Sequence, residues 1–516
     1  MPSVKVTLHR VHNHCVVTPT TPRLLRVLKP ALTGVYTERL SPREAKRQGV
    51  KYLIHREALY WLDAKRRLCT TAAFTPKIHQ SLKQAGYEVY YKRWTHPEHP
   101  EVYEPDWDAV WDTYDLRWMQ DQVLLKLCVE DFGVIKCPPA YGKTTMQCAV
   151  ALLFPKARID YVCARTSVLR DIYRELVGLG VDVGIISSAK RANPQARVRA
   201  YTPRSLTQGV FDADIVLADE VHLLAADSYS ALLARYRHAK MFGFSASPER
   251  ADGKHARIEA LFGPRLIDIS TAEATRRGLV APVEVHWRVV DGRDVGAGIE
   301  NDTTFARRAI WTNTFRNQII AEDARSYGED VQRLIVVSTT EHAMHLKRLL
   351  PEFELAYAGG TLSEEDRRRY VAMGCISEDE PRMNAQRLDM LQRQFAAKKL
   401  RKAIATTVWD TGVDFRHLDV LIRADAGSSP IKDTQLPGRA MRTSAGKEVG
   451  IVRDYVDVFN QRTYRRSLGR RRSYEQHGWI QHWPEEELRR RARRATGPAG
   501  PGRADSLHPE DAGVSG

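Results

Sequence analysis

The sequence is poor in cysteine: seven are scattered among 516 residues, and no two form a C-x-x-C pair. This pattern predicts reduced, mostly buried thiols. No run of 18 apolar residues occurs, which argues against a membrane-spanning helix. The first residues, MPSVKVTLHRVHNHC, lack the apolar core of a signal peptide. We therefore expect a cytoplasmic protein without a membrane partner.

Acidic residues are also fewer than basic ones. Lys and Arg outnumber Asp and Glu by 79 to 63, which gives a net charge of +16. Such a balance favours a polyanionic partner, either nucleic acid or, as the weaker alternative, an anionic membrane surface. The hydrophobic share of 43% and the charged share of 28% are those of an ordinary globular protein. The length predicts roughly three or four domains.

Residues 1 to 100 contain no nucleotide-binding pattern, and their second half alternates as strand, helix and strand. The helix is expected from Thr75, a cap residue before Pro76, to Gly86, where it should stop. The pattern is that of a small α+β module, followed by a linker at 97–106. Its last strand either contacts nucleic acid by stacking and charge or is a solvated face. The side chains concerned are Tyr90, Lys92, Arg93 and Trp94.

Beyond the linker, short apolar runs alternate with helix-compatible stretches. Such alternation predicts a parallel sheet covered by helices on both faces. In that architecture ligands bind beyond the carboxyl ends of the strands, so catalytic side chains are expected there. The predicted strands are residues 132–137, 159–164, 183–187, 198–202, 214–218 and 241–245.

A loop of sequence CPPAYGKTT, Cys137–Thr145, lies between the first of these strands and a helix-compatible run at 144–153. Strand, tight loop and helix form the arrangement that points backbone N–H groups at a phosphate. Gly142 allows close approach to the anion because it has no Cβ. Lys143 supplies a charge for the β- and γ-phosphate oxygens, and Thr144 supplies a hydroxyl for Mg²⁺.

The loop departs from the general pattern, since Cys137 stands where a glycine is usual. On the loop alone, a solvated Gly-Lys turn remains the alternative to a phosphate site. Further residues expected to contact a bound nucleotide are Ala140, Tyr141 and Thr145.

Two other segments carry side chains suited to the same ligand. The strand at 214–218 runs into Asp219 and Glu220, and a carboxylate at a strand end can hold Mg²⁺ directly or through water. A second carboxylate beside it can orient the attacking water as a general base, although a solvated acidic turn is the alternative. Upstream, Gln120 can pair with adenine through both side-chain groups, and Arg117 can stack on the ring.

Together the segments LRWMQ, AYGKT, DEVH and SASPERADGK resemble the first motor domain of superfamily 2 helicases. The form is DExH, close to the XPB/UvsW-like and phage DEAD/DEAH-type helicases. The resemblance implies that Gln120 reads adenine and that Lys143 and Thr144 hold phosphate and Mg²⁺. It also implies that Asp219 binds metal and that Glu220 activates water. The residues implied to couple hydrolysis to strand movement are His222, Ser245 and Ser247.

The second half of the chain predicts a second domain of the same architecture. Its segment QLPGRAMR, Gln435–Arg442, resembles the element in which this family places its arginine fingers. A spacing of three puts Arg439 and Arg442 on one helix face, and a planar guanidinium suits the charge on γ-phosphate oxygens. A basic helix without a phosphate partner is the alternative. The turn with Gly412 and Asp414 resembles the family's link between nucleotide and nucleic acid. The expected strands are 284–290, 333–339, 355–360, 403–407 and 418–424.

We predict an α/β protein with two tandem RecA-like parallel-sheet domains and a small N-terminal α+β module. Residues 461–494 hold 11 Arg and 4 Glu, a net charge of +7, with Trp479 and Trp483 among them. This segment either binds nucleic acid by counterion release and stacking or packs on the second domain as a solvated basic helix. The expected boundaries are 1–100 for the accessory module, 101–280 for an ATP-binding domain, 281–465 for the second RecA-like domain and 466–516 for a basic helix and disordered tail.

The function expected from these features is that of an ATP-dependent DNA helicase or translocase. It would use ATP and Mg²⁺, with DNA as its partner and replication or recombination proteins as further candidates. It would act in the cytoplasm, the host's if the chain is of phage origin. Three alternatives stay open: remodelling of branched DNA without net unwinding, an RNA substrate, and a non-catalytic nucleic-acid-binding protein with a relict motor.

Overall fold

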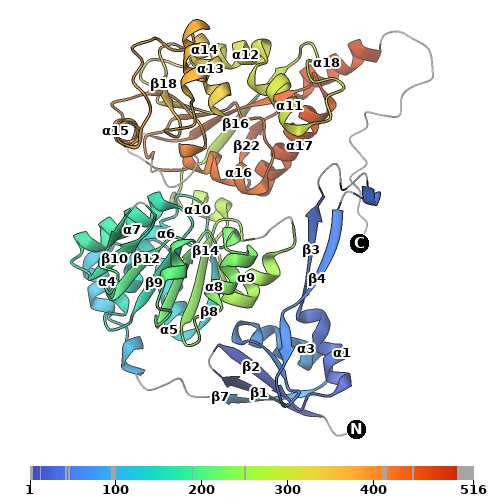
Figure 1. Ribbon diagram of the computed structural model, residues 1–516, viewed down its shortest axis with the longest axis vertical. Coiled ribbons are helices and arrows are strands. Elements are labelled where there is room, and N and C mark those ends of the chain that lie inside the picture. The colour runs from blue at the N-terminus through green and yellow to red at the C-terminus, as the bar shows by residue number, and fades with distance from the viewer. Residues whose placement is uncertain are drawn as a thin grey trace.

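The computed structural model describes residues 4–496 except 12, 41–43, 45, 46, 51, 94–99, 189, 249–251, 410–414 and 444–446. Three bodies follow one another along the long axis: an N-terminal module and two α/β domains (Figure 1). Within the described ranges, no helix combines the length and apolar character needed to cross a bilayer. Sequence-based expectations for Trp94, Glu249–Ala251, Gly412, Asp414 and residues 497–516 lie outside the described residues.

The N-terminal module is a five-stranded sheet with strand order β5-β6-β2-β1-β7. Its helices α1 and α3 bury Leu24, Leu28, Ile78 and Leu82 against the sheet. The predicted helix is confirmed, but the expectation that Thr75 caps it is wrong, because Thr75 is its first residue and Phe74 stands at the cap position. The strands are β1 (Lys5–Val11), β2 (His14–Thr18), β5 (Tyr60–Leu62), β6 (Leu68–Thr71) and β7 (Glu88–Arg93), and the helices are α1 (Pro22–Ala31) and α3 (Thr75–Gln84).

A separate hairpin of β3 (Thr33–Arg39) and β4 (Tyr52–Ala58) projects from the module along the first α/β domain (Figure 1). Thr37 N–H donates to the carbonyl of Asp252, 2.8 Å away, just before helix α9 (His255–Phe262). Arg257 of α9 pairs with Glu57 of the hairpin at 2.7 Å. The hairpin therefore docks on the segment that follows the SASP motif.

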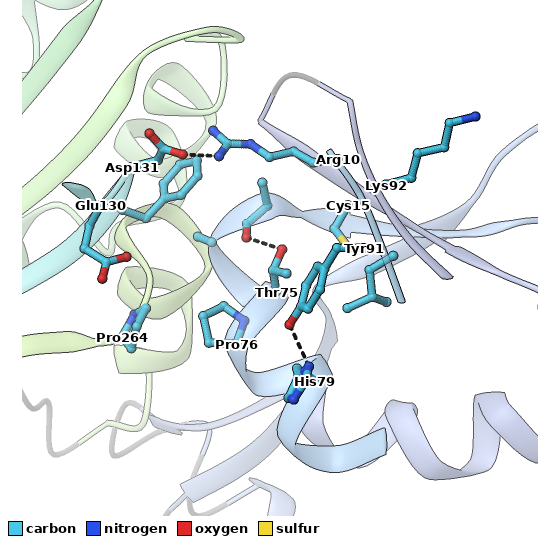
Figure 2. Close-up of a pocket in the computed structure, with 14 residues that line it drawn as sticks. Arg10, Cys15, Thr75, Pro76, His79, Tyr91, Lys92, Glu130, Asp131 and Pro264 are labelled. Atoms are coloured by element: carbon cyan, nitrogen blue, oxygen red, sulfur yellow. Dashed lines mark hydrogen bonds and ion pairs between the residues drawn. The ribbon is translucent and has the colours of Figure 1, made fainter. Parts of the chain in front are cut away.

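The module itself docks on the first α/β domain through polar contacts. Arg10 pairs with Asp131, and Lys77 pairs with Glu259 at 2.7 Å. Figure 2 shows the cavity beside this contact, of about 630 Å³, into which His79 and Tyr91 bring their rings. These rings stack on each other with centroids 5.5 Å apart. Contact between strand β7 and nucleic acid stays a prediction.

The first α/β domain has the strand order β11-β10-β12-β9-β13-β14-β8-β15, parallel except for the β10–β11 pair. Alternate residues of β13 belong to two different hydrophobic clusters. Ile215 and Leu217 belong to the first cluster, and Val216 and Ala218 belong to the second. Because both faces are covered, its strands are mostly apolar in sequence, apart from buried charges such as Asp160 of β9, which pairs with Arg199 of β12 at 2.7 Å. The six predicted strands are confirmed. The strands are β8 (Phe132–Lys136), β9 (Ile159–Cys163), β10 (Val183–Ile186), β11 (Arg191–Ala192), β12 (Val198–Tyr201), β13 (Ile215–Asp219), β14 (Lys240–Ser245) and β15 (Arg265–Asp268).

Helices α4, α5, α6 and α7 contribute to the first of these clusters and helices α8 and α9 to the second, so the sheet is covered on both sides. The bounds are α4 (Trp107–Thr113), α5 (Gln120–Val129), α6 (Lys143–Leu153), α7 (Thr166–Gly178), α8 (Asp227–Leu233), α9 (His255–Phe262) and α10 (Thr271–Arg276).

The second α/β domain is an all-parallel sheet of order β18-β19-β17-β20-β21-β16-β22. The strands are β16 (Val283–Val290), β17 (Arg333–Val336), β18 (Glu354–Ala356), β19 (Lys402–Ala405), β20 (Val420–Arg423), β21 (Gly450–Asp457) and β22 (Ile480–His482). The helices are α11 (Asp302–Ala306), α12 (Thr314–Arg325), α13 (Thr340–Leu349), α14 (Glu364–Ala372), α15 (Ala385–Ala396), α16 (Pro430–Gln435), α17 (Gln461–Gln476) and α18 (Glu485–Thr496).

The basic C-terminal segment is built into this second domain. The expected boundary at 465/466 is wrong, because it falls inside α17 and because β22 pairs with β16. Arg470 of α17 is fully buried and bonds Asp454 of β21 at 2.9 Å. Trp479 is 7% exposed, and Trp483 lies edge-on to Trp287. Both tryptophans therefore pack on the second domain, as the second of the two alternatives for this segment predicts.

Candidate active site

Four neighbouring strands of the first domain end at one edge. In the order β8, β14, β13 and β9 they are paired in parallel, with Ser245 opposite Lys136 and Cys163 opposite Asp219. Each carboxyl end leads into a segment with polar side chains. Ligands of open α/β sheets bind at this edge, so the register brings the predicted phosphate loop and the acidic pair to one place.

The phosphate loop has a backbone conformation that suits its sequence. Gly142 caps α6 with a φ of 101°, and Ala140 also has a positive φ, of 64°. Lys143, Thr144 and Thr145 form the first turn of α6 and are half-buried. Cys137 is completely buried, which raises the pKa of its thiol to about 11. Cysteine therefore replaces the usual glycine as a neutral, packed side chain at the start of the loop.

Gln120 is locked against the phosphate loop. Its Oε1 accepts a hydrogen bond from Arg117 N–H at 2.9 Å, and its Nε2 donates to the Tyr141 carbonyl at 3.1 Å. A Cβ on Gly142 would lie 2.6 Å from Gln120 Nε2, so only glycine allows this approach. An amide group can make four hydrogen bonds in all, so these two leave capacity for a base. Contact of Gln120 and Arg117 with adenine stays a prediction.

Asp219 and Glu220 are both buried at the end of β13. Glu220 has a left-handed φ of 49°, a backbone strain of about 1–3 kcal/mol that is typical of functional sites. Its Oε1 lies 3.5 Å from Arg165, and its Oε2 lies 3.4 Å from His222 Nδ1. The strained turn thus holds the carboxylate at the strand edge between two nitrogen groups.

The expected metal ligands, Thr144 and Asp219, both offer oxygen, which Mg²⁺ prefers. Burial and the charge of Glu220 raise the pKa of Asp219 to about 6. Its carboxylate receives long contacts from Gln147 Nε2 at 3.5 Å and from Cys163 Sγ at 3.8 Å. A bound cation would favour its charged form. The donor set therefore fits Mg²⁺ held in part through water.

A chain of hydrogen bonds leads from the acidic motif into the second domain. His222 Nδ1 and Ser245 Oγ are 3.0 Å apart, and Ser247 N–H donates to Ser245 Oγ at 3.1 Å. Ser247 Oγ lies 3.5 Å from Thr434 Oγ1, which in turn lies 2.7 Å from His477 Nε2. Three residues predicted to couple hydrolysis to movement are therefore joined physically to α16 and α17.

The QLPGRAMR segment meets the phosphate loop directly. A Cβ on Gly438 would lie 2.5 Å from Pro139 Cγ, so the two domains touch with no room for a side chain. The expectation of one helix face for Arg439 and Arg442 is wrong. Helix α16 ends at Gln435, a single turn spans Pro437–Arg439, and Arg442 lies beyond it. Pro437 has no backbone N–H and therefore breaks the helix.

Arg165 is a residue of the site that sequence reasoning missed. It follows β9, and its Nη2 donates to Gln435 Oε1 of the second domain at 2.6 Å. The same guanidinium lies 3.5 Å from Glu220. The sequence did carry one indication of this role. A cation that follows a buried parallel strand is expected at the edge of the sheet where ligands bind.

Comparisons with known proteins agree with this arrangement. The family described as "Helicase conserved C-terminal domain" matches residues 317–444. A protein described as a helicase of Sulfolobus islandicus filamentous virus is 23% identical over 358 residues, 63% of this chain and 60% of the relative. The DNA 3'-5' translocase XPB2 of Sulfurisphaera tokodaii is 28% identical over 159 residues, 30% of this chain and 35% of the relative. The chain thus spans less than two thirds of either relative.

Among solved structures, S. cerevisiae Dbp5 bound to RNA and ADP BeF3 has a TM-score of 0.51 at 15% identity, covering 76% of this chain and 96% of that one. This likeness supports the fold. The two facing parallel-sheet domains thus define a protein of the tandem RecA-like class. Within that class the chain is similar to helicases: residues 317–444 match the helicase C-terminal family, and its relatives include a viral helicase and an XPB-type DNA translocase.

Proposed function

We propose that the protein hydrolyses ATP and uses the energy to move along DNA. The observation that carries this proposal is the junction of the two sheets. There the phosphate loop, the Asp219–Glu220 pair and the Gln435 segment meet through the Arg165 bridge and the Gly438–Pro139 contact. A nucleotide bound at this junction would contact both domains, so its hydrolysis can change how they are held together.

Each group has a distinct task in this proposal. Lys143 and the amides of the loop bind the β- and γ-phosphates, while Glu220 orients the attacking water. Arg439 and Arg442 would approach the γ-phosphate from the second domain, where guanidinium groups stabilise developing charge. Mg²⁺, held by Thr144 and Asp219, would supply neutralisation of phosphate charge when bound.

DNA is the favoured track because the chain has a net charge of +16 and a relative described as a DNA translocase. RNA is a second candidate, since the structurally similar Dbp5 is bound to RNA. Whether the motor unwinds duplexes or remodels branched DNA depends on the track it engages, and the substrate assay below separates these possibilities.

The test is the ATPase rate of wild type, Lys143→Ala and Lys156→Ala. Lys156 is an exposed lysine of the same domain, paired with Glu104, and serves as control. Each protein is assayed alone and with single-stranded DNA, duplex, a fork or RNA. We expect stimulation by DNA that is lost only in Lys143→Ala. Preference for the fork would indicate remodelling, and stimulation by RNA alone would overturn the DNA assignment. An inactive wild type would overturn the motor itself.

A further inference from the structure

The free edge of the second sheet brings two histidines and a glutamate onto one face. Strand β22 is the edge strand among the described residues, and it pairs in parallel with β16 so that His482 lies opposite His286. Glu284 precedes His286 by two residues on β16, and side chains two apart along a strand point to the same face. None of the three belongs to the nucleotide site.

The distances among these side chains suit a metal ion. Glu284 Oε2 lies 3.0 Å from His482 Nε2 and 3.4 Å from His286 Nε2. All three ligand atoms lie within 4.8 Å of one another, and no other such group of three or more occurs in the described part of the chain. Zn²⁺ binds such ligands tetrahedrally at about 2.0–2.2 Å, which separates neighbouring ligand atoms by roughly 3.4 Å.

The chemistry of the group points the same way. Two imidazoles and one carboxylate are a frequent donor set of three-ligand zinc sites, which keep one position for water. The side chains of Glu284 and His286 are 33% exposed and that of His482 is 50% exposed, so an ion can enter from solvent.

We propose that Glu284, His286 and His482 bind one divalent transition-metal ion, with Zn²⁺ as the ion that fits best. Strand β22 has three residues, so its pairing with β16 is short. The side chain of Ile480 in this strand is 54% exposed. An ion shared between the two strands fastens β22 to the sheet. It also fixes the end of α17, where His477 contacts Thr434 beside the domain junction. The site is independent of the proposed motor function.

The experiment is a calorimetric titration of metal-depleted full-length protein with Zn²⁺. We expect one ion per chain in wild type and at least about tenfold weaker binding in His286→Ala and His482→Ala. Glu284→Gln keeps a hydrogen-bond acceptor but removes the charge, so it should bind weakly while remaining folded. His55→Ala is the matched control, because His55 also contacts a carboxylate, Glu38, at 2.8 Å but has no second histidine beside it.

Two further readouts accompany the titration. Zn²⁺ should raise the melting temperature of wild type and of His55→Ala but not of Glu284→Gln. Co²⁺ should give visible absorption typical of a tetrahedral N/O site in wild type and in His55→Ala but not in Glu284→Gln. If wild type binds no ion at micromolar Zn²⁺, or if Glu284→Gln and both histidine variants bind as wild type does, the three side chains are only a hydrogen-bonded cluster and the proposal is overturned.

Discussion

Arg165 joins the two α/β domains: its Nη2 donates to Gln435 Oε1 at 2.6 Å, while its Nη1 lies 3.5 Å from Glu220 Oε1. One side chain thus connects the acidic motif of the first domain to the QLPGRAMR segment of the second. The link bears on hydrolysis because Glu220 is the proposed water-orienting group. A change in domain spacing would move the guanidinium and, with it, the charge beside Glu220.

Arg165→Ala should therefore lower the kcat of ATP hydrolysis by about 10- to 100-fold. The estimate follows from about 1.5–3 kcal/mol for a hydrogen bond to a charged group, with a tenfold change per 1.4 kcal/mol. Steady-state kinetics with saturating nucleic acid measures it. Arg174→Ala is the control, since Arg174 lies on the following helix in an exposed pair with Asp171. Equal kcat in the two variants would contradict the role given to the bridge.

The strands of the first domain could be predicted because buried parallel strands have largely apolar sequences, and a single charge such as Asp160 of β9 does not break the pattern. Strand β21 could not, since it carries Arg453, Asp454 and Asp457 at the centre of a sheet. The two aspartates are fully buried, and their partners are Arg470 and Arg316, each 2.9 Å away. These partners lie outside the strand, on α17 and α12, so the local pattern of β21 gives no sign that the charges are neutralised.

The site was predictable where one segment suffices and not where two segments meet. The backbone of Gly142 and the strand end at Asp219 follow from local sequence. The β3–β4 hairpin was missed because its outer face is exposed, with Ile54 at 70%, and its strands lack an apolar pattern. The arginine segment was placed on a continuous helix because its spacing outweighed Pro437, which the structure shows to be the break.

Gly438→Ala tests the contact between the domains. The new Cβ would lie 2.5 Å from Pro139 Cγ, and overpacking of this kind costs about 1–3 kcal/mol. We expect kcat/KM for ATP to fall about tenfold or more, because the phosphate loop or the second domain must shift. Gly328→Ala is the control, since a Cβ there has no neighbour within 4 Å. An unchanged kcat/KM in Gly438→Ala would show that this contact is absent during turnover.

Asn13→Ala tests how the N-terminal module is attached. Asn13 Nδ2 donates to the carbonyls of Tyr236 and Ala239 at 3.0 and 3.1 Å, and the side chain is buried. Removing a buried donor costs about 1–3 kcal/mol, so the midpoint of urea unfolding should fall accordingly. Gln122→Ala, which truncates an exposed amide, should leave that midpoint unchanged. Equal midpoints would mean that the two hydrogen bonds of Asn13 contribute nothing to stability.

His477 predicts a pH dependence of stability. Burial and the nearby Lys136 lower the pKa of His477 to about 4, below the usual value of about 6.5. The unfolded chain therefore binds a proton more readily than the folded one, and the contribution of His477 to stability is lost as the pH falls from about 6.5 to about 4.

The difference in melting temperature between wild type and His477→Gln isolates this effect from other titrating groups. We expect the difference to be constant above pH 7 and to move against wild type as the pH falls below 6.5. Protonation would also place a charge beside Lys136. A difference that stays constant down to pH 4 would mean that His477 keeps an ordinary pKa in the folded protein.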